Sequence, residues 1–147
     1  MDRSFVAAND AARARLIALV NRLSEDDLRH PMPAEWTVSA VFAHMAFWDA
    51  RALYFINKWE GGIPPSEADL ESGDVDWVNN SAKPLCLALP PRTAADLAVQ
   101  LAEETDRRVA GMSDTLIEQM LAIGQPFYLA RAEHRTEHLD EIEQALR

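Results

Sequence analysis

The chain has 147 residues, of which 48% are hydrophobic and 26% are charged, and its formal net charge is −10 at pH 7. This length fits one domain with a substantial core, and the composition is that of a folded globular protein rather than a disordered one. The acidic balance argues against binding to nucleic acid or to an anionic membrane surface, because no basic stripe is present to neutralise phosphates.

The N-terminal segment lacks an apolar signal core with a cleavage site, so we expect the protein to stay in the cytoplasm. Apolar residues recur at spacings of three and four from about Ser4 to Leu23, which predicts a first helix. The loop "HPMPAEW" follows, and we interpret His30 at its start as incidental. Thr37 then stands where a helix N-cap is expected.

A second helix is predicted from Val38 to about Glu60, with its end at Gly61 and Gly62. It is apolar nearly all round, which is typical of a central helix covered by its neighbours. The chain nevertheless has no uninterrupted apolar run of about 18 residues, which excludes a membrane-spanning helix.

Residues 61–91 form an irregular connection, longer than is usual within a compact domain and therefore typical of a crossover or a functional loop. A short helix would fit Val75 to Leu87, but Pro84 in its interior counts against it. Cys86 is the only cysteine, so neither an internal disulfide nor a thiolate cluster is available.

The third main helix is predicted from Thr93 to about Val109, and the last from near Pro126 to the end of the chain. No alternating run indicates a strand, and no second domain boundary is evident. Residues 1–147 are therefore predicted to form one all-α domain, a four-helix bundle with a long crossover between the second and third helices.

The histidines indicate where chemistry would take place. His134 and His138 lie one turn apart on the inward sector of the last helix, opposite its run of acidic residues, and His44 faces the core from the second helix. Three neutral imidazoles suit Zn²⁺, Ni²⁺ or Fe²⁺ and leave a position open for water or substrate. A histidine pair at this spacing also arises by chance, and a lone core histidine is often only hydrogen-bonded. The pattern alone therefore leaves a metal site and a structural interpretation both open.

Three stretches resemble a known family. "EWTVSAVFAHMAFWDARAL" (35–53) resembles the second-helix signature of the DinB/YfiT-like superfamily, "EHRTEHLDEIEQAL" (133–146) resembles its closing H-x-x-x-H helix, and "VDWVNN" (75–80) resembles a stretch before its third helix. The resemblance implies a bundle that holds a divalent ion through His44, His134 and His138. It also implies a homodimer and an enzyme of detoxification or stress response, either a thiol S-transferase using a bacillithiol- or mycothiol-like cosubstrate or a hydrolase.

Other residues are candidates for holding a small-molecule substrate. The arginines are the cations that would hold an anionic group, and the remaining candidates would line a pocket. The full set is Trp48, Arg51, Asn79, Tyr128 and Arg131. No general base is evident, so the catalytic residues are not assigned: Glu137 and Glu141 are interpreted as solvated or as partners that orient imidazole N–H groups, and Asp49 as a surface or cap contact.

Two alternatives to an enzyme are open at this point. The first is a non-catalytic, metal-containing bundle that binds a small molecule. A fourth protein ligand, such as Asp74 or Asp76, would favour a structural metal, since structural zinc sites are closed. The second is a plain interaction bundle that uses its histidines as core filler and its apolar surface for dimerisation.

Overall fold

A computed structural model of the chain describes residues 1–69, 73–124 and 126–147. The described residues are mostly helical, which confirms the all-α class. The α-helices in the described ranges are α1 (Ser4–Arg22), α2 (Glu25–Leu28), α3 (Val38–Glu60), α4 (Asp76–Ala88), α5 (Pro91–Ala110), α6 (Asp114–Ala122) and α7 (Ala132–Ala145). The described helices include none that is long and apolar enough to cross a membrane.

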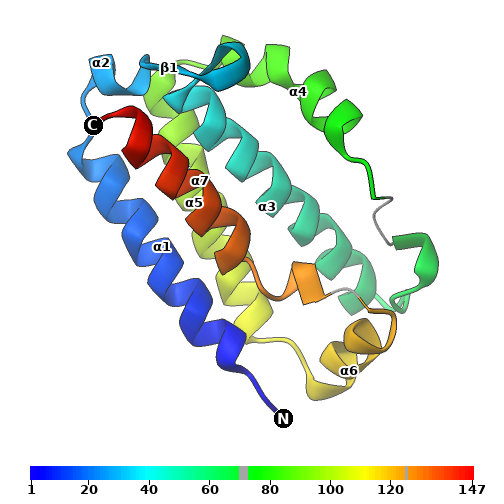
Figure 1. Ribbon diagram of the computed structural model, residues 1–147. Helices are drawn as coiled ribbons and strands as arrows, with labels where there is room; N and C mark the ends of the chain where they lie inside the picture. Colours follow the sequence, from blue (N-terminus) through cyan, green and yellow to red (C-terminus); the bar gives the residue numbers. More distant parts are fainter. Residues whose placement is uncertain (70–72, 125) are drawn as a thin grey trace.

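The four longest helices, α1, α3, α5 and α7, lie side by side, and α4 runs across one end of them (Figure 1). Helix α3 packs against α5 and α7, and α1 packs against the same two helices. The α5 face toward this core is built from small residues, which allow helices to approach closely. The buried alanines of that face are Ala94, Ala95, Ala98 and Ala102.

Local sequence explains the bounds of α3, which begins at Val38 and ends at Glu60 as predicted. The Thr37 side-chain oxygen accepts a hydrogen bond from the Ala40 amide at 3.1 Å, so Thr37 is the N-cap. Helix α5 begins at Pro91, two residues before the predicted Thr93. Proline suits a first helical turn because the amide that it lacks would have no partner there.

Three predictions of local structure need correction. Two short strands are present, β1 (Pro31–Met32) and β2 (Trp36–Thr37), paired antiparallel around the 3₁₀ turn η1 (Pro33–Glu35). Strands of two residues are too short for alternation to be visible in the sequence. Helix α4 forms with Pro84 in its interior, and a further 3₁₀ turn, η2 (Glu67–Asp69), lies within the connection expected to be irregular.

The last helix begins at Ala132, not near Pro126, because Pro126–Tyr128 forms a separate 3₁₀ turn, η3. The buried Asn9 of α1 holds the chain between the two elements. Its amide donates to the Leu129 carbonyl at 2.7 Å, and its side-chain oxygen accepts from the Ala132 amide at 2.9 Å. A side chain more than a hundred positions away therefore sets where α7 starts.

Candidate metal centre

Three half-buried histidines from two helices meet between α3 and α7. One ring nitrogen from each of His44, His134 and His138 lies within 4.8 Å of the other two. His134 is central, because its Nε2 atom lies 3.2 Å from Nε2 of His44 and 3.1 Å from Nε2 of His138. Aromatic rings surround the group: Trp36 and Trp48 contact the His44 ring, and Phe127 contacts the His134 ring.

Hydrogen bonds among the imidazoles cannot satisfy all three Nε2 atoms at once. His138 Nδ1 lies 2.9 Å from the Glu141 carboxylate, so Nδ1 carries the proton and donates it, and Nε2 of His138 is left with its lone pair. The central Nε2 of His134 carries either one proton or one lone pair, yet it lies between two neighbouring Nε2 atoms. One such nitrogen bonds only one of those neighbours well. A shared cation, in contrast, would accept all three lone pairs.

Burial favours the neutral form of the His44 and His134 imidazoles. Desolvation is the main cause that lowers the pKa of His44 from 6.5 to about 4, with the neighbouring His138 second. Desolvation likewise lowers the pKa of His134 to about 2, helped by His138 and Arg131. Since the neutral imidazole is the form that ligates metals, the surroundings favour the ligand state near neutral pH.

The spacing and chemistry of the donors fit a divalent ion. Metal–nitrogen bonds of about 2.0–2.1 Å in a tetrahedral arrangement separate two ligand nitrogens by roughly 3.3 Å, close to the 3.1 and 3.2 Å spacings observed. Within the described ranges, the three histidines form the complete group of closely spaced donors, and neither Asp74 nor Asp76 belongs to it. The arrangement is therefore that of an open site with three protein ligands rather than a closed, four-coordinate one.

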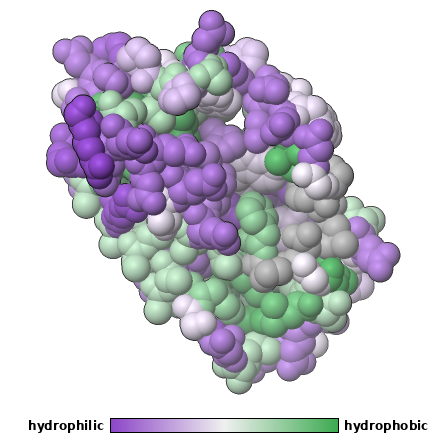
Figure 2. Space-filling view, in the orientation of Figure 1, coloured by the Kyte–Doolittle hydropathy of each residue, from purple (hydrophilic) through white to green (hydrophobic). Residues whose placement is uncertain are grey.

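A cavity of about 800 Å³ adjoins the histidines and reaches His44 and His138. It lies beside α7, whose outer surface is hydrophilic (Figure 2). One part of its wall is apolar, with Met32, Trp36 and Val41, and the remainder carries amide and carboxylate groups. The polar lining residues are Asp76, Asn79, Asn80, Glu141 and Gln144. This size and mixture suit a small molecule with an apolar body and a few hydrogen-bonding groups.

Two predicted substrate residues lie near the histidines, although Trp48 contacts the His44 ring without lining the cavity. Asn79 lines the cavity, and its side-chain oxygen accepts a hydrogen bond of 2.9 Å from Nε1 of the buried Trp48. An indole N–H only donates, so the amide oxygen of Asn79 must face Trp48, and the orientation of the amide is fixed. The Asn79 NH₂ group is thereby turned away from Trp48 as a donor for another partner.

The other three predicted substrate residues do not line this cavity. Tyr128 is buried, donates its hydroxyl proton to the Asp69 carbonyl at 2.8 Å and accepts a hydrogen bond from Arg51 at 3.2 Å. Arg51 lies over the Trp48 and Phe55 rings. Arg131 is fully buried, and its guanidinium pairs with Asp49. The expectation that these arginines hold an anionic substrate therefore has no counterpart in the cavity wall.

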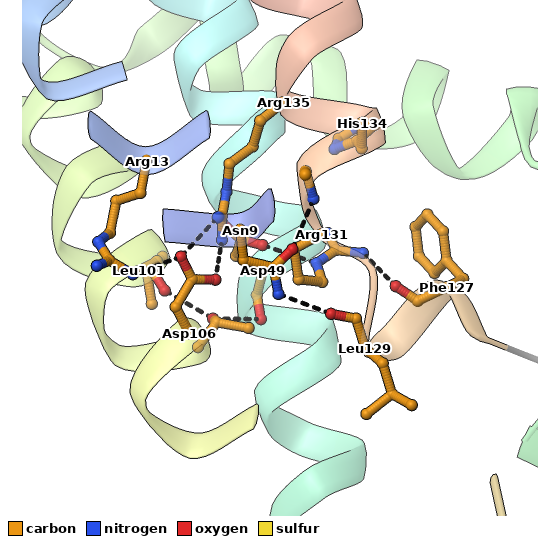
Figure 3. A network of polar contacts seen from close by, with 12 residues as sticks. Asn9, Arg13, Asp49, Leu101, Asp106, Phe127, Leu129, Arg131, His134 and Arg135 are labelled. Carbon is orange, nitrogen blue, oxygen red and sulfur yellow. Dashed lines mark hydrogen bonds and ion pairs between the residues drawn. The ribbon is translucent and has the colours of Figure 1, made fainter. Parts of the chain in front are cut away.

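The interpretation of Asp49 as a surface or cap contact is wrong, since only 2% of this residue is exposed. Its carboxylate accepts from Nε of Arg131 at 2.9 Å and from Nη2 of Arg135 at 3.2 Å, and Arg135 also forms two bonds to Asp106 (Figure 3). The angle of Asp49 on its own helix does not reveal its burial, because α3 is covered by neighbours on more than one side.

The spacing of the arginines is a sequence signal for Arg135. Arg131, the N-cap of α7, and Arg135 repeat the four-residue spacing of His134 and His138, so two polar pairs are directed inward from α7 and its N-cap. The carboxylates that face them, Asp49 and Asp106, come from α3 and α5. No local pattern indicates these long-range pairs.

Comparison with known protein families gives a match over most of the chain. The model of a family described as the DinB superfamily matches residues 8–141, nearly the whole chain. Neither the curated proteins nor the solved structures include a match to this sequence.

Proposed function

The chain belongs to the DinB superfamily, and on that basis we propose that it is a divalent-metal-dependent enzyme built on the four-helix bundle of that superfamily. Its ligands would be His44, His134 and His138, and its ion Zn²⁺, Ni²⁺ or Fe²⁺. The observation that carries the proposal is the convergence of three imidazole nitrogens from two helices within 4.8 Å of one another.

The reaction that we propose is the transfer of a low-molecular-weight thiol, resembling bacillithiol or mycothiol, to an electrophile, or else hydrolysis. A bound divalent ion lowers the pKa of a water or thiol that it contacts, and so supplies a nucleophile near neutral pH. The transfer scheme fits a chain whose single cysteine, Cys86, is buried, because the reacting thiol would arrive as a cosubstrate.

The residues of this chain would orient the ligands and the substrate. Glu141 accepts the Nδ1 proton of His138 and so keeps the lone pair of His138 on Nε2. Asn79, fixed by Trp48, offers N–H donors at the cavity wall, and Trp36 and Val41 provide apolar surface there. A substrate in this cavity would therefore be held by amide hydrogen bonds and apolar contact.

A non-catalytic, metal-containing bundle that binds a small molecule is the second candidate. The carboxylate bonded to the imidazole cluster, Glu141, already accepts a hydrogen bond from His138. It is thus engaged in orienting a ligand instead of standing free as a general base. Homodimer formation and a cytoplasmic location stay predictions.

Metal titration tests the proposal. Protein purified without a histidine tag and stripped of metal should bind about one Co²⁺ or Zn²⁺ per chain, and His44→Ala should reduce that affinity at least a hundredfold, because two ligands hold the ion far less tightly than three. His30→Ala is the matched control, since His30 is exposed and lies outside the cluster. Undiminished binding by His44→Ala would contradict the metal centre.

Turnover separates the enzyme from the binding bundle. A panel of thiols with an alkylating electrophile, and of simple esters and amides, should reveal a rate that metal restores and that His44→Ala abolishes. Tight binding of metal with no turnover across the panel would favour the second candidate.

A further inference from the structure

The buried ion pairs next to the imidazoles occupy the same stretch of the same two helices. Arg131, the N-cap of α7, precedes His134 by three positions, and Arg135 in α7 follows it by one, so both arginines lie within one turn of the central histidine. On α3, Asp49 follows His44 by five positions. In Figure 3 Arg135 points toward both carboxylates and Arg131 toward Asp49, while His134 leaves the helix away from them.

A single carboxylate on α3 holds both the N-cap and the first turn of α7. One oxygen of Asp49 accepts from Arg131 and the other from Arg135. Exposure of both guanidinium groups is at most 1%, and that of Asp49 is 2%, so water does not compete for these bonds. Charge-assisted bonds are short and directional, whereas apolar contacts between helices tolerate small sliding and rotation.

Because the three ligands come from two separate helices, the metal centre needs the position of α7 relative to α3 to be fixed. Ligand nitrogens must reach a metal to within a few tenths of an ångström, and only His134 and His138 are fixed relative to each other by a shared helix. The position of His44 relative to that pair depends on how α3 and α7 sit against each other.

We propose that Asp49 is a positioning residue for the metal centre. By holding Arg131 and Arg135, it sets the axial position and rotation of the first turns of α7, so that His134 meets His44. This inference rests on the metal centre proposed above. It gives Asp49 a part in binding the ion, although Asp49 is not itself a ligand.

Asp106 provides a matched control within the same network. It is also buried, with 4% exposure, and it also binds Arg135, through two bonds of 2.8 Å. Its other partner is Arg13 of α1, at 2.7 Å. Asp106 therefore joins α5 to α1 and α7 but leaves α3 aside, so its removal breaks ion pairs of the same kind without releasing α7 from α3.

The test compares Asp49→Asn with Asp106→Asn by Co²⁺ titration, followed through the visible absorption bands, at a temperature where circular dichroism shows both variants folded. Both substitutions should lower the thermal midpoint, because each leaves a buried arginine short of a partner. Only Asp49→Asn should also weaken Co²⁺ binding, by about tenfold or more. Its Co²⁺ bands should lose intensity, since a displaced ligand gives way to water.

A second variant keeps the test valid if Asp49→Asn does not fold. The double variant Asp49→Asn/Arg131→Gln removes the unpaired cation together with the carboxylate, and it should show the same loss of Co²⁺ affinity. Co²⁺ binding within about twofold of wild type in the folded Asp49 variants would overturn the positioning role, and so would an equal loss in Asp106→Asn. Failure of the wild-type chain itself to bind Co²⁺ would instead overturn the metal centre.

Discussion

Two clusters of polar side chains join α3 to α7, a buried one of ion pairs and a half-buried one of imidazoles, and they differ in how their charges and lone pairs are satisfied. In the ion-pair cluster of Asp49, Asp106, Arg131 and Arg135, every carboxylate faces a guanidinium. In the imidazole cluster of His44, His134 and His138, three groups of the same kind face one another. The first cluster is neutralised from within, whereas the second presents lone pairs that only an added cation would satisfy together.

The comparison shows that spacing alone does not distinguish a structural pair from a ligand pair. Arg131 with Arg135 and His134 with His138 have the same four-residue spacing, the first pair starting at the N-cap of α7 and the second lying within α7. What distinguishes them is the facing residue on α3, a carboxylate for the arginines and a further imidazole for the histidines. Buried like groups without a countercharge are a sign of a functional site, while opposed charges are a sign of a structural contact.

The largest expected effect comes from opening the ion-pair cluster. Arg135→Met should lower the free energy of unfolding by about 3 kcal/mol, at the lower end for a broken buried ion pair. The loss is limited because Asp49 keeps Arg131 and Asp106 keeps Arg13 as partners. Urea unfolding of the metal-free protein measures it. A loss of less than about 1 kcal/mol would mean that the cluster contributes little beyond its desolvation cost.

Sequence alone predicts the elements that are encoded locally. The Thr37 cap, the all-round apolar character of the second helix and the Gly61–Gly62 end together predict the bounds of α3, Val38 and Glu60. The inward placement of His134 and His138 also follows from one helix and its periodicity. These features depend on neighbours in the chain, which a sequence displays directly.

Features that depend on distant partners are not predictable in this way. The start of α7 at Ala132 depends on the side chain of Asn9, and the burial of Asp49 depends on arginines more than eighty positions away. A wheel drawn for one helix gives the angle of Asp49 but not which neighbour covers that angle. The expectation that Arg131 holds a substrate has the same origin, because the sequence does not display its partner, Asp49.

The pH dependence of stability sharpens the comparison. In the metal-free protein, burial holds the pKa of His44 at about 4 and that of His134 at about 2, below the unfolded value of 6.5. Between pH 6.5 and the folded values, the unfolded chain binds more protons, so stability is full above about pH 6.5 and falls as the pH decreases. From pH 6.5 to 5.5 the two histidines should together remove roughly 2 kcal/mol.

Urea unfolding of the metal-free protein across this range measures the effect. Saturating Zn²⁺ should raise the stability at pH 7 and steepen its loss in acid, because protons then compete with the ion for the same nitrogens. A free energy of unfolding that stayed flat between pH 6.5 and 5.5 without metal would show that the imidazoles are protonated as easily in the folded chain as in the unfolded one.

The smallest expected effect on stability comes from removing the central imidazole. At pH 8, His134→Leu should change the free energy of unfolding of the metal-free protein by no more than about 1 kcal/mol, because leucine fills much of the same buried space and needs no hydrogen-bond partner. The same variant should lose Co²⁺ binding, and its loss of stability between pH 6.5 and 5.5 should be about half that of the wild type, since one of the two shifted histidines is gone. A destabilisation as large as that of Arg135→Met would place the imidazoles with the ion pairs as structural contacts. A small one, joined to complete loss of the ion, would mean that these three rings are kept in the core for what they bind and not for what they stabilise.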